Sequence, residues 1–206
     1  MTSVPPIILA SASPRRANLL TQMGLSFEVV PSHIPEVVLP GEDPKAHARR
    51  LSLEKGREVW GSHRESLIIA GDTVVVMEGE ILGKPRDVED AVSMLLALSG
   101  RTHTVVSGLA LVFPSGHSRA GTLSTQVTFR PFGAEIARAY AETGEPLDKA
   151  GSYGIQGMGS TLVQEIRGDY HTVVGLPIPL LLELLDSEGW AYEFGRLVPG
   201  GSGRKK

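Results

Sequence analysis

Short apolar runs alternate along the chain with longer segments in which apolar residues recur every three or four positions. The runs at residues 7–10 and 67–70 contain only Ile, Leu and Ala, a composition typical of strands buried on both faces. Residues 88–98 show the helical spacing instead. The alternation of the two patterns predicts an α/β fold, in which helices cover the faces of a sheet.

The same patterns divide most of the chain into elements. We predict strands at residues 7–10, 27–30, 67–70 continuing through 73–77, 104–113 and 123–129. We predict helices at residues 14–23, 44–60, 88–98, 134–142 and 177–185. Residues 152–160 are rich in glycine and are expected to be irregular. No repeat or linker interrupts the pattern, so we expect one domain with two lobes over residues 1–195 and a flexible basic tail at residues 196–206.

Composition narrows the class of protein. The chain has 206 residues, of which 41% are hydrophobic, enough for a substantial core. A net charge of −3 gives no overall attraction to nucleic acid or to an anionic membrane, and we expect neither as a partner. The absence of cysteine excludes disulfides, thiol catalysis and cysteine-bound zinc. Since no apolar run approaches the roughly 20 residues of a membrane span and no signal peptide is found, we expect a cytoplasmic protein.

The tetrapeptide Ser13-Pro14-Arg15-Arg16 directly follows the first predicted strand. Ser13 suits a helix N-cap and Pro14 the first helical position, which places both arginines at the positive end of a helix. That placement is unfavourable by roughly 0.3–1 kcal/mol per charge. A bound phosphate would remove the penalty, because helix N-termini present free N–H groups to anions. The alternative is a pair of exposed arginines in a surface turn.

Several other polar residues are candidates for chemistry. Asp72 follows the apolar run 67–70 and needs a partner, which a divalent cation or an activated water could supply; the alternative is a local Asx turn. Lys84 lies in a charged turn near the same strand end. Lys55, between apolar positions, either extends its charge to solvent or faces a site. Glu36 is either a surface acid or a metal ligand.

A glycine-rich segment at residues 151–159 contains Tyr153 and Gln156. The Gln156 amide supplies both the donor and the acceptor needed to read a nucleobase edge, whereas the alternative is a flexible loop. No histidine cluster, P-loop or nucleophile motif is found. Basic groups, isolated carboxylates and this loop together indicate metal-assisted attack of water on a phosphoanhydride.

Taken together and in this order, the motifs resemble the Maf family of nucleoside triphosphate pyrophosphatases over nearly the whole chain. The matching segments are the Glu36 loop and residues 9–16, 40–44, 54–55, 72–75, 82–85, 94–95, 98–103, 143–151, 153–157, 168–170 and 173–177. The resemblance implies an elongated, strongly twisted mixed β-sheet flanked by helices, with two lobes around a central cleft, as in Maf and ITPase folds. It also implies a divalent metal cation (Mg²⁺ or Mn²⁺) and a homodimer.

The implied reaction is hydrolysis of a nucleoside triphosphate to the monophosphate and pyrophosphate, by water attack at the α-phosphate. Two arginines after Ser-Pro, and Thr73 after Asp72, resemble the branch that hydrolyses dTTP, UTP and modified pyrimidine analogues. By resemblance, substrate contacts fall at Ser13, Arg15, Arg16, Lys55, Thr73, Lys84 and Gln156, with Thr73 and Gln156 setting specificity. The implied general base is Asp72, and the implied metal ligands are Glu36 and Asp72.

Two positions depart from the family pattern. Gly71 stands where alanine is usual before the aspartate, and Pro35 replaces an acid that often precedes Glu36. The second change removes a carboxylate from the predicted metal site. Two alternatives stay open: a regulatory protein that binds nucleotide or nucleic acid and inhibits septum formation during cell division, and a house-cleaning pyrophosphatase for ITP or 7-methyl-GTP. Metal-dependent pyrophosphate release across a panel of nucleotides separates these possibilities.

Overall fold

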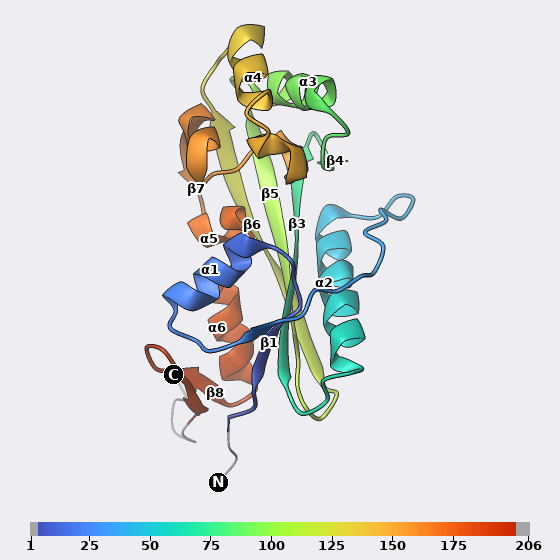
Figure 1. Cartoon of the computed structure of the whole chain (residues 1–206), viewed down its shortest axis with the longest axis vertical. Helices are drawn as coiled ribbons and strands as arrows, with labels where there is room; N and C mark the ends of the chain where they lie inside the picture. Colours follow the sequence, from blue (N-terminus) through green and yellow to red (C-terminus); the bar gives the residue numbers. More distant parts are fainter. Residues whose placement is uncertain (1–3, 201–206) are drawn as a thin grey trace.

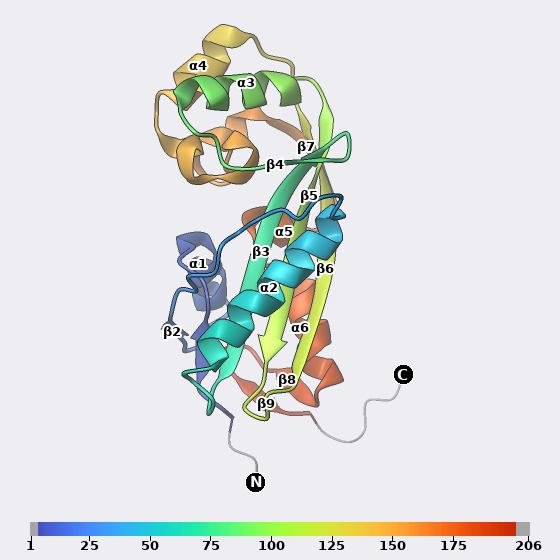
Figure 2. The same ribbon diagram turned by 90° about the vertical axis from the view of Figure 1, so that its right-hand side faces the viewer.

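The computed structural model describes residues 4–200 and is organised around one long, strongly twisted sheet (Figure 1 and Figure 2). The strand order is β2-β1-β3-β5-β6-β7, and β4 pairs with β3. The strands are β1 (Ile7–Leu9), β2 (Glu28–Val29), β3 (Leu67–Met77), β4 (Glu80–Leu82), β5 (Thr102–Val112), β6 (Ser118–Phe129) and β7 (Val163–Arg167). Since β1 is parallel to β2 and β3 and the other pairs are antiparallel, the sheet is mixed, which confirms the predicted fold class.

Helices cover both faces of the sheet. They are α1 (Pro14–Gln22), α2 (Pro44–Trp60), α3 (Val88–Leu98), α4 (Ala134–Ala141), α5 (Tyr170–Val174) and α6 (Ile178–Ser187), with short 3₁₀ helices η1 (Glu145–Asp148), η2 (Ala150–Ser152) and η3 (Gly157–Leu162). Helix α2 lies on one face of the lower half, and α1 and α6 lie on the other (Figure 1). Helices α3 and α4 form the upper end with the 3₁₀ helices (Figure 2). None of the described helices is long and apolar enough to cross a membrane.

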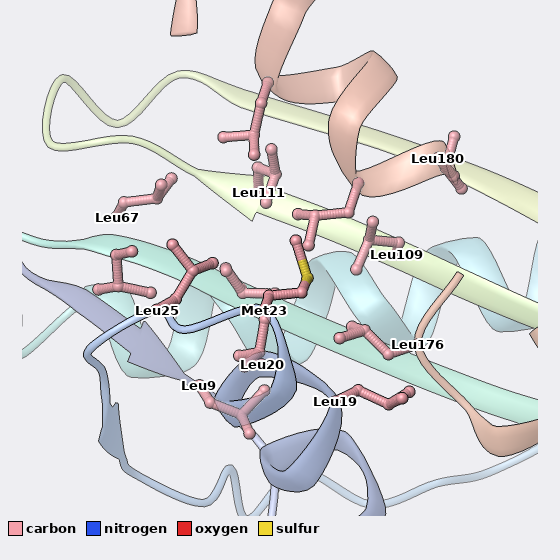
Figure 3. Packing of buried hydrophobic residues seen from close by; sticks show 14 of the residues in the cluster. Leu9, Leu19, Leu20, Met23, Leu25, Leu67, Leu109, Leu111, Leu176 and Leu180 are labelled. Carbon is pink, nitrogen blue, oxygen red and sulfur yellow. The ribbon is translucent and has the colours of Figure 1, made fainter. Parts of the chain in front are cut away.

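Two large hydrophobic cores lie along this sheet, and two smaller clusters pack α2 against it. The lower core packs α1 and α6 against β1, β3 and β5 through residues such as Leu9, Leu20, Leu67 and Leu109 (Figure 3). The upper core packs α3 and α4 around Phe129 and includes Val75 and Val105 of the same long strands. Strands β3 and β5 therefore run through both lobes. The middle of β3, where Asp72 lies, falls between the two cores.

The structure differs from the sequence prediction in several places, including α5, β8 (Trp190–Tyr192) and η3, none of which was predicted. Strand β6 begins at Ser118 rather than at residue 123, because pairing with β5 extends it through small and polar residues that show no apolar alternation. Strand β7 was not predicted. The predicted tail at residues 196–206 begins too early, since Leu197–Pro199 forms β9, which pairs with β8, and Leu197 is only 3% exposed. Residues 201–206 lie outside the described residues.

Close packing of α2 against β5 depends on Gly108, which pairs with Asp72 across the β3–β5 register. A Cβ atom at Gly108 would lie 2.1 Å from the Ala48 carbonyl oxygen, and that backbone cannot move without displacing the whole helix. A Cβ atom at Gly121, also in the sheet, would lie 3.0 Å from Leu180 Cδ1, the far end of a flexible side chain.

We therefore expect Gly108→Ala to lower the free energy of unfolding by about 3 kcal/mol or more, because the new methyl group would collide with helix backbone, which cannot shift as a side chain can. Gly121→Ala, the matched control, is expected to change it by less than about 1 kcal/mol. Urea denaturation of both variants measures the difference. Equal stability of Gly108→Ala and the unaltered protein would contradict the close approach of α2 to β5.

Candidate active site

A cleft of about 330 Å³ opens beside the middle of β3 and is lined from both lobes. Residues 10–16 form one wall, and residues 148–155 form part of the opposite wall. All of the predicted site residues except one lie in its lining: Ser13, Arg15, Arg16, Glu36, Lys55, Asp72, Thr73 and Lys84. The exception is Gln156, whose neighbours Gly154 and Ile155 line the cleft.

Lys55 joins the two predicted metal-facing carboxylates. Its Nζ atom donates to Asp72 Oδ1 at 2.7 Å and to Glu36 Oε1 at 2.5 Å. Lys55 is 7% exposed and Asp72 is 5% exposed, so neither extends to solvent and each charge requires the other. Both alternatives considered from the sequence are therefore wrong: Lys55 does not reach for solvent, and Asp72 lies within continuous strand rather than in an Asx turn.

Glu36 lies on the loop between β2 and α2 and is half-exposed at the edge of the cleft. Burial alone would raise the pKa of Glu36. The hydrogen bond from Lys55 and the nearby positive charges of Lys55, Lys84 and Arg16 lower the pKa by more than burial raises it. The net pKa lies below the usual value, so Glu36 is ionised at neutral pH. Lys84 Nζ lies 3.8 Å from Glu36 Oε2, farther than Lys55 Nζ lies from Glu36 Oε1. Lys55 is therefore the stronger partner of this carboxylate.

Arg16 is buried, and its hydrogen-bond acceptors among residues 4–200 are all neutral. Its Nε donates to the Gly175 carbonyl at 2.7 Å, its Nη1 to Ser11 Oγ at 2.9 Å and its Nη2 to Thr73 Oγ1 at 3.1 Å. Burial lowers its pKa, and the charges of Asp72 and Glu36 act in the opposite direction. Arg16 thus joins α1, β3 and the end of α5. It also leaves a positive charge in the cleft wall that no hydrogen-bonded carboxylate neutralises.

The hydroxyl of Thr73 belongs to the same network. Thr73 Oγ1 lies 2.8 Å from Ser107 Oγ, and Ser107 in turn donates to the Thr172 carbonyl at 2.7 Å. Because Ser107 is fully buried, this chain of bonds holds α5 against β3 and β5. The Thr73 side chain therefore supports the wall of the cleft as well as lining it.

Arg15 lies at the N-terminus of α1 and faces the upper lobe. Its Nη1 lies 3.7 Å from Asp148 Oδ2, which is strongly exposed. The pair is long and solvated, so it contributes little stability and leaves Arg15 available to an anion. Ser13 occupies the N-cap position of α1, but its side chain makes no capping hydrogen bond, so its hydroxyl is not committed to the helix.

The glycine-rich segment is held firmly, so the flexible-loop alternative is wrong. Glu145 accepts hydrogen bonds from the backbone N–H groups of Met158 and Gly159, both at 3.0 Å, and from the Tyr140 hydroxyl at 2.9 Å. The Tyr140 oxygen also accepts from the Gly154 N–H at 3.1 Å. These bonds fix the backbone that forms the upper wall of the cleft.

Behind this wall lies a buried histidine. His103 Nε2 is 2.8 Å from the Tyr153 hydroxyl, and the two rings make an edge contact. Burial lowers the pKa of His103 to about 4, so the ring is neutral at physiological pH. The pair anchors Tyr153, which lines the cleft, on strand β5.

Sequence reasoning missed several lining residues. Ser11, Ser32, Asp148 and Lys149 contribute to the cleft, and Lys149 Nζ donates to Asp148 Oδ1 at 2.6 Å. Ser11, Asp148 and Lys149 fall inside the matched motifs at residues 9–16 and 143–151, and this membership in a motif could have marked them as candidate site residues. The proximity of Asp148 and Lys149 to Arg15 could not be deduced, because it depends on how the two lobes meet.

The carboxylates fit a divalent metal only in part. Within residues 4–200, no group of three or more His, Cys, Asp and Glu side chains converges to hold a metal by itself. Glu36 and Asp72 nevertheless offer carboxylate oxygens close together through Lys55. Magnesium is commonly held by one or two carboxylates together with substrate phosphates. The donor set therefore fits a metal that arrives with a polyphosphate.

Fold and site together define a mixed α/β protein whose interlobe cleft combines arginines and lysines with the buried carboxylate of Asp72 and the half-exposed carboxylate of Glu36. The family model described as "Maf-like protein" matches residues 6–188, and the chain belongs to this family. A dTTP/UTP pyrophosphatase of Desulfotalea psychrophila is 50% identical over 181 residues, which are 87% of this chain and 93% of that protein. The dTTP/UTP pyrophosphatase of Aquifex aeolicus is 44% identical over 179 residues, covering 87% and 93%.

A solved structure supports the architecture. The Ham1 protein of Staphylococcus aureus aligns with a TM-score of 0.55 and 13% identity, covering 89% of this chain and 99% of that one. At this identity the likeness shows the fold alone. It agrees with the ITPase-like sheet and two lobes predicted from the sequence.

The Lys55 bridge gives a prediction for Glu36. We expect Lys55→Met to raise the pKa of Glu36, because burial remains while the hydrogen bond and the charge of the ammonium are lost. The stability from Glu36 ionisation is present above its unfolded pKa of about 4.5 and is lost as the pH falls through its lower folded pKa. Lys55→Met removes this contribution.

Carbon NMR titration of the Glu36 carboxyl group measures the change. Lys84→Met is the matched control and is expected to raise the pKa less, because Lys84 is more distant and more exposed. An unchanged Glu36 pKa in Lys55→Met, or an equal rise in Lys84→Met, would show that Lys55 is not its dominant partner.

Proposed function

We propose that this protein hydrolyses nucleoside triphosphates, with dTTP, UTP and modified pyrimidine analogues preferred, to the monophosphate and pyrophosphate. The observation that carries the proposal is the buried carboxylate of Asp72, held by Lys55 in a cleft whose lining also carries Arg15, Arg16 and Lys84. The names of relatives at 44–50% identity, dTTP/UTP pyrophosphatase, support the same reaction and the same bases.

The basic groups supply the triphosphate site. Arg15 at the N-terminus of α1 and Lys84 at the cleft edge are the more accessible charges, and Arg16 adds a buried one. A phosphate at this helix end would relieve the unfavourable placement of both arginines. The Ser13 hydroxyl is a further donor. Pyrophosphate is then the leaving group that these residues hold.

Asp72 is the proposed general base. Its Oδ1 is oriented by Lys55, whereas its Oδ2 has no hydrogen-bond partner within residues 4–200 and is the atom we expect to take the proton from water. A divalent cation (Mg²⁺ or Mn²⁺) bound by Glu36, Asp72 and phosphate oxygens would neutralise charge and favour hydroxide at the α-phosphate. Lys55 meanwhile keeps the two carboxylates at a fixed separation despite their mutual repulsion.

The base is expected to lie against the upper wall. Uracil and thymine present an N3–H donor flanked by two carbonyl acceptors, whereas cytosine presents an acceptor at N3. Backbone groups around Gly154 line the cleft, and the Gln156 amide follows two residues later. Gln156 and Thr73 remain the proposed specificity residues. A homodimer, a cytoplasmic location and a link to cell-division arrest remain predictions from the family resemblance.

Hydrolysis in ¹⁸O-labelled water tests the reaction. We expect the label in the nucleoside monophosphate and unlabelled pyrophosphate, because water attacks the α-phosphate. Across a nucleotide panel, kcat/KM for dTTP and UTP should exceed that for CTP about ten- to a hundredfold, since each unpaired polar group costs roughly 1–3 kcal/mol. Label in orthophosphate would contradict the reaction, and ITP or 7-methyl-GTP as the best substrate would contradict the specificity.

A further inference from the structure

We infer that Glu42 and Arg50 act as positioning residues, forming a clamp that holds Glu36 over Lys55. The inference rests on the proposed function, because it concerns how the candidate metal-facing carboxylate reaches the cleft. Glu36 comes from the segment between β2 and α2, which has no helix or strand of its own over residues 30–43. Something other than regular secondary structure must therefore fix its position.

Hydrophobic burial does not hold this segment. Val37 is 59% exposed, Val38 is 48% exposed and Leu39 is 46% exposed, although all three follow Glu36 directly. Ordering an irregular segment costs conformational entropy, and side chains that stay exposed do not offset this cost. Polar bonds to the segment must therefore offset it. The polar contacts of the segment therefore decide where Glu36 lies.

Arg50 of α2 supplies those contacts. Its guanidinium donates to both oxygens of Glu42, from Nε to Oε1 at 2.6 Å and from Nη2 to Oε2 at 2.7 Å. Nη2 also donates to the Val37 carbonyl at 2.9 Å, next to Glu36 in the chain. Such two-pronged arginine–carboxylate pairs are strong and directional. One side chain thus holds the segment at two points.

Glu42 completes the clamp on the loop side. Its Oε2 lies 2.9 Å from His47 Nδ1 and accepts from the Leu39 N–H at 3.2 Å, and its side chain is 9% exposed. The hydrogen bond from Arg50 lowers the pKa of Glu42 to about 2. The carboxylate is therefore ionised and paired over the whole pH range in which an assay is run.

Helix α2 carries both Arg50 of the clamp and Lys55, the partner of Glu36. Arg50 fixes the segment through Val37 and Glu42, and Lys55, farther along the same helix, receives the carboxylate of Glu36. Because a helix is rigid, the distance between clamp and lysine is constant. Without the clamp, the position of Glu36 would depend only on its ion pairs with Lys55 and Lys84. Displacement of a reacting group by about 1 Å can lower a rate about a hundredfold.

The experiment compares Arg50→Lys with Arg138→Lys. Arg138 also makes a two-pronged pair, with Glu89 at 2.7 and 2.8 Å, but it joins α4 to α3 in the upper lobe. We expect Arg50→Lys to lower kcat for UTP about 10–100-fold while KM changes less than about threefold, because Arg15 and Lys84 stay in place. Arg138→Lys should leave both parameters unchanged.

Hydrogen exchange provides a readout that does not depend on activity. The hydrogen-bonded amides of Leu39 and Glu42 should exchange faster in Arg50→Lys and in Glu42→Gln, and at the unaltered rate in Arg138→Lys. Glu42→Gln keeps the side-chain volume and serves as the second variant if Arg50→Lys does not fold. Thermal unfolding of all variants separates local loosening from loss of the fold.

Each outcome decides the inference. Faster exchange together with the fall in kcat supports it. Unaltered exchange in both clamp variants overturns it, and so does faster exchange with unaltered kcat. An unaltered protein without pyrophosphatase activity would overturn the proposed function instead, and exchange would then decide separately whether the clamp fixes the segment.

Discussion

The buried ammonium of Lys55 is the interaction on which the rest of the site depends. It joins three parts of the chain that are distant in sequence: helix α2, strand β3 through Asp72 and the β2–α2 segment through Glu36. Two carboxylates this close repel each other unless a cation lies between them. Removing Lys55 leaves the buried carboxylate of Asp72 and the half-exposed carboxylate of Glu36 without their shared cation, which is more unfavourable than losing a surface ion pair.

The sheet places this interaction between the lobes. Strands β3 and β5 each contribute residues to both hydrophobic cores, and Asp72 pairs with Gly108 at the level where the cores separate. The missing side chain at Gly108 lets α2 approach the sheet closely enough to bring Lys55 against Asp72. On the other face, Arg16 ties α1 to β3 and to Gly175 at the end of α5. The cleft thus lies where two cores meet that share β3 and β5, one packing α1 and α6 and the other packing α3 and α4.

Much of this could be predicted from the sequence, because periodicity and capping are local. The apolar run at residues 67–70 and the proline at the start of α2 led directly to elements that the structure contains. The upstream half of β6 could not be predicted, since it is a strand only through its pairing with β5. Candidate site residues were recognised by type, but their partners were not. The hydrogen bonds of Arg16 to three neutral acceptors and the ion pair of Arg50 with Glu42 join residues that show no recognisable pattern in the sequence.

In the proposed reaction, Asp72, oriented by Lys55, activates the attacking water. The most direct measurement is kcat of Asp72→Asn with UTP at saturating metal, alongside its thermal unfolding. Asparagine keeps the size of the side chain but cannot take the proton, so we expect kcat to fall about 10²–10⁴-fold with the fold retained. A folded Asp72→Asn variant with near-normal kcat would contradict the account and remove Asp72 from the chemistry.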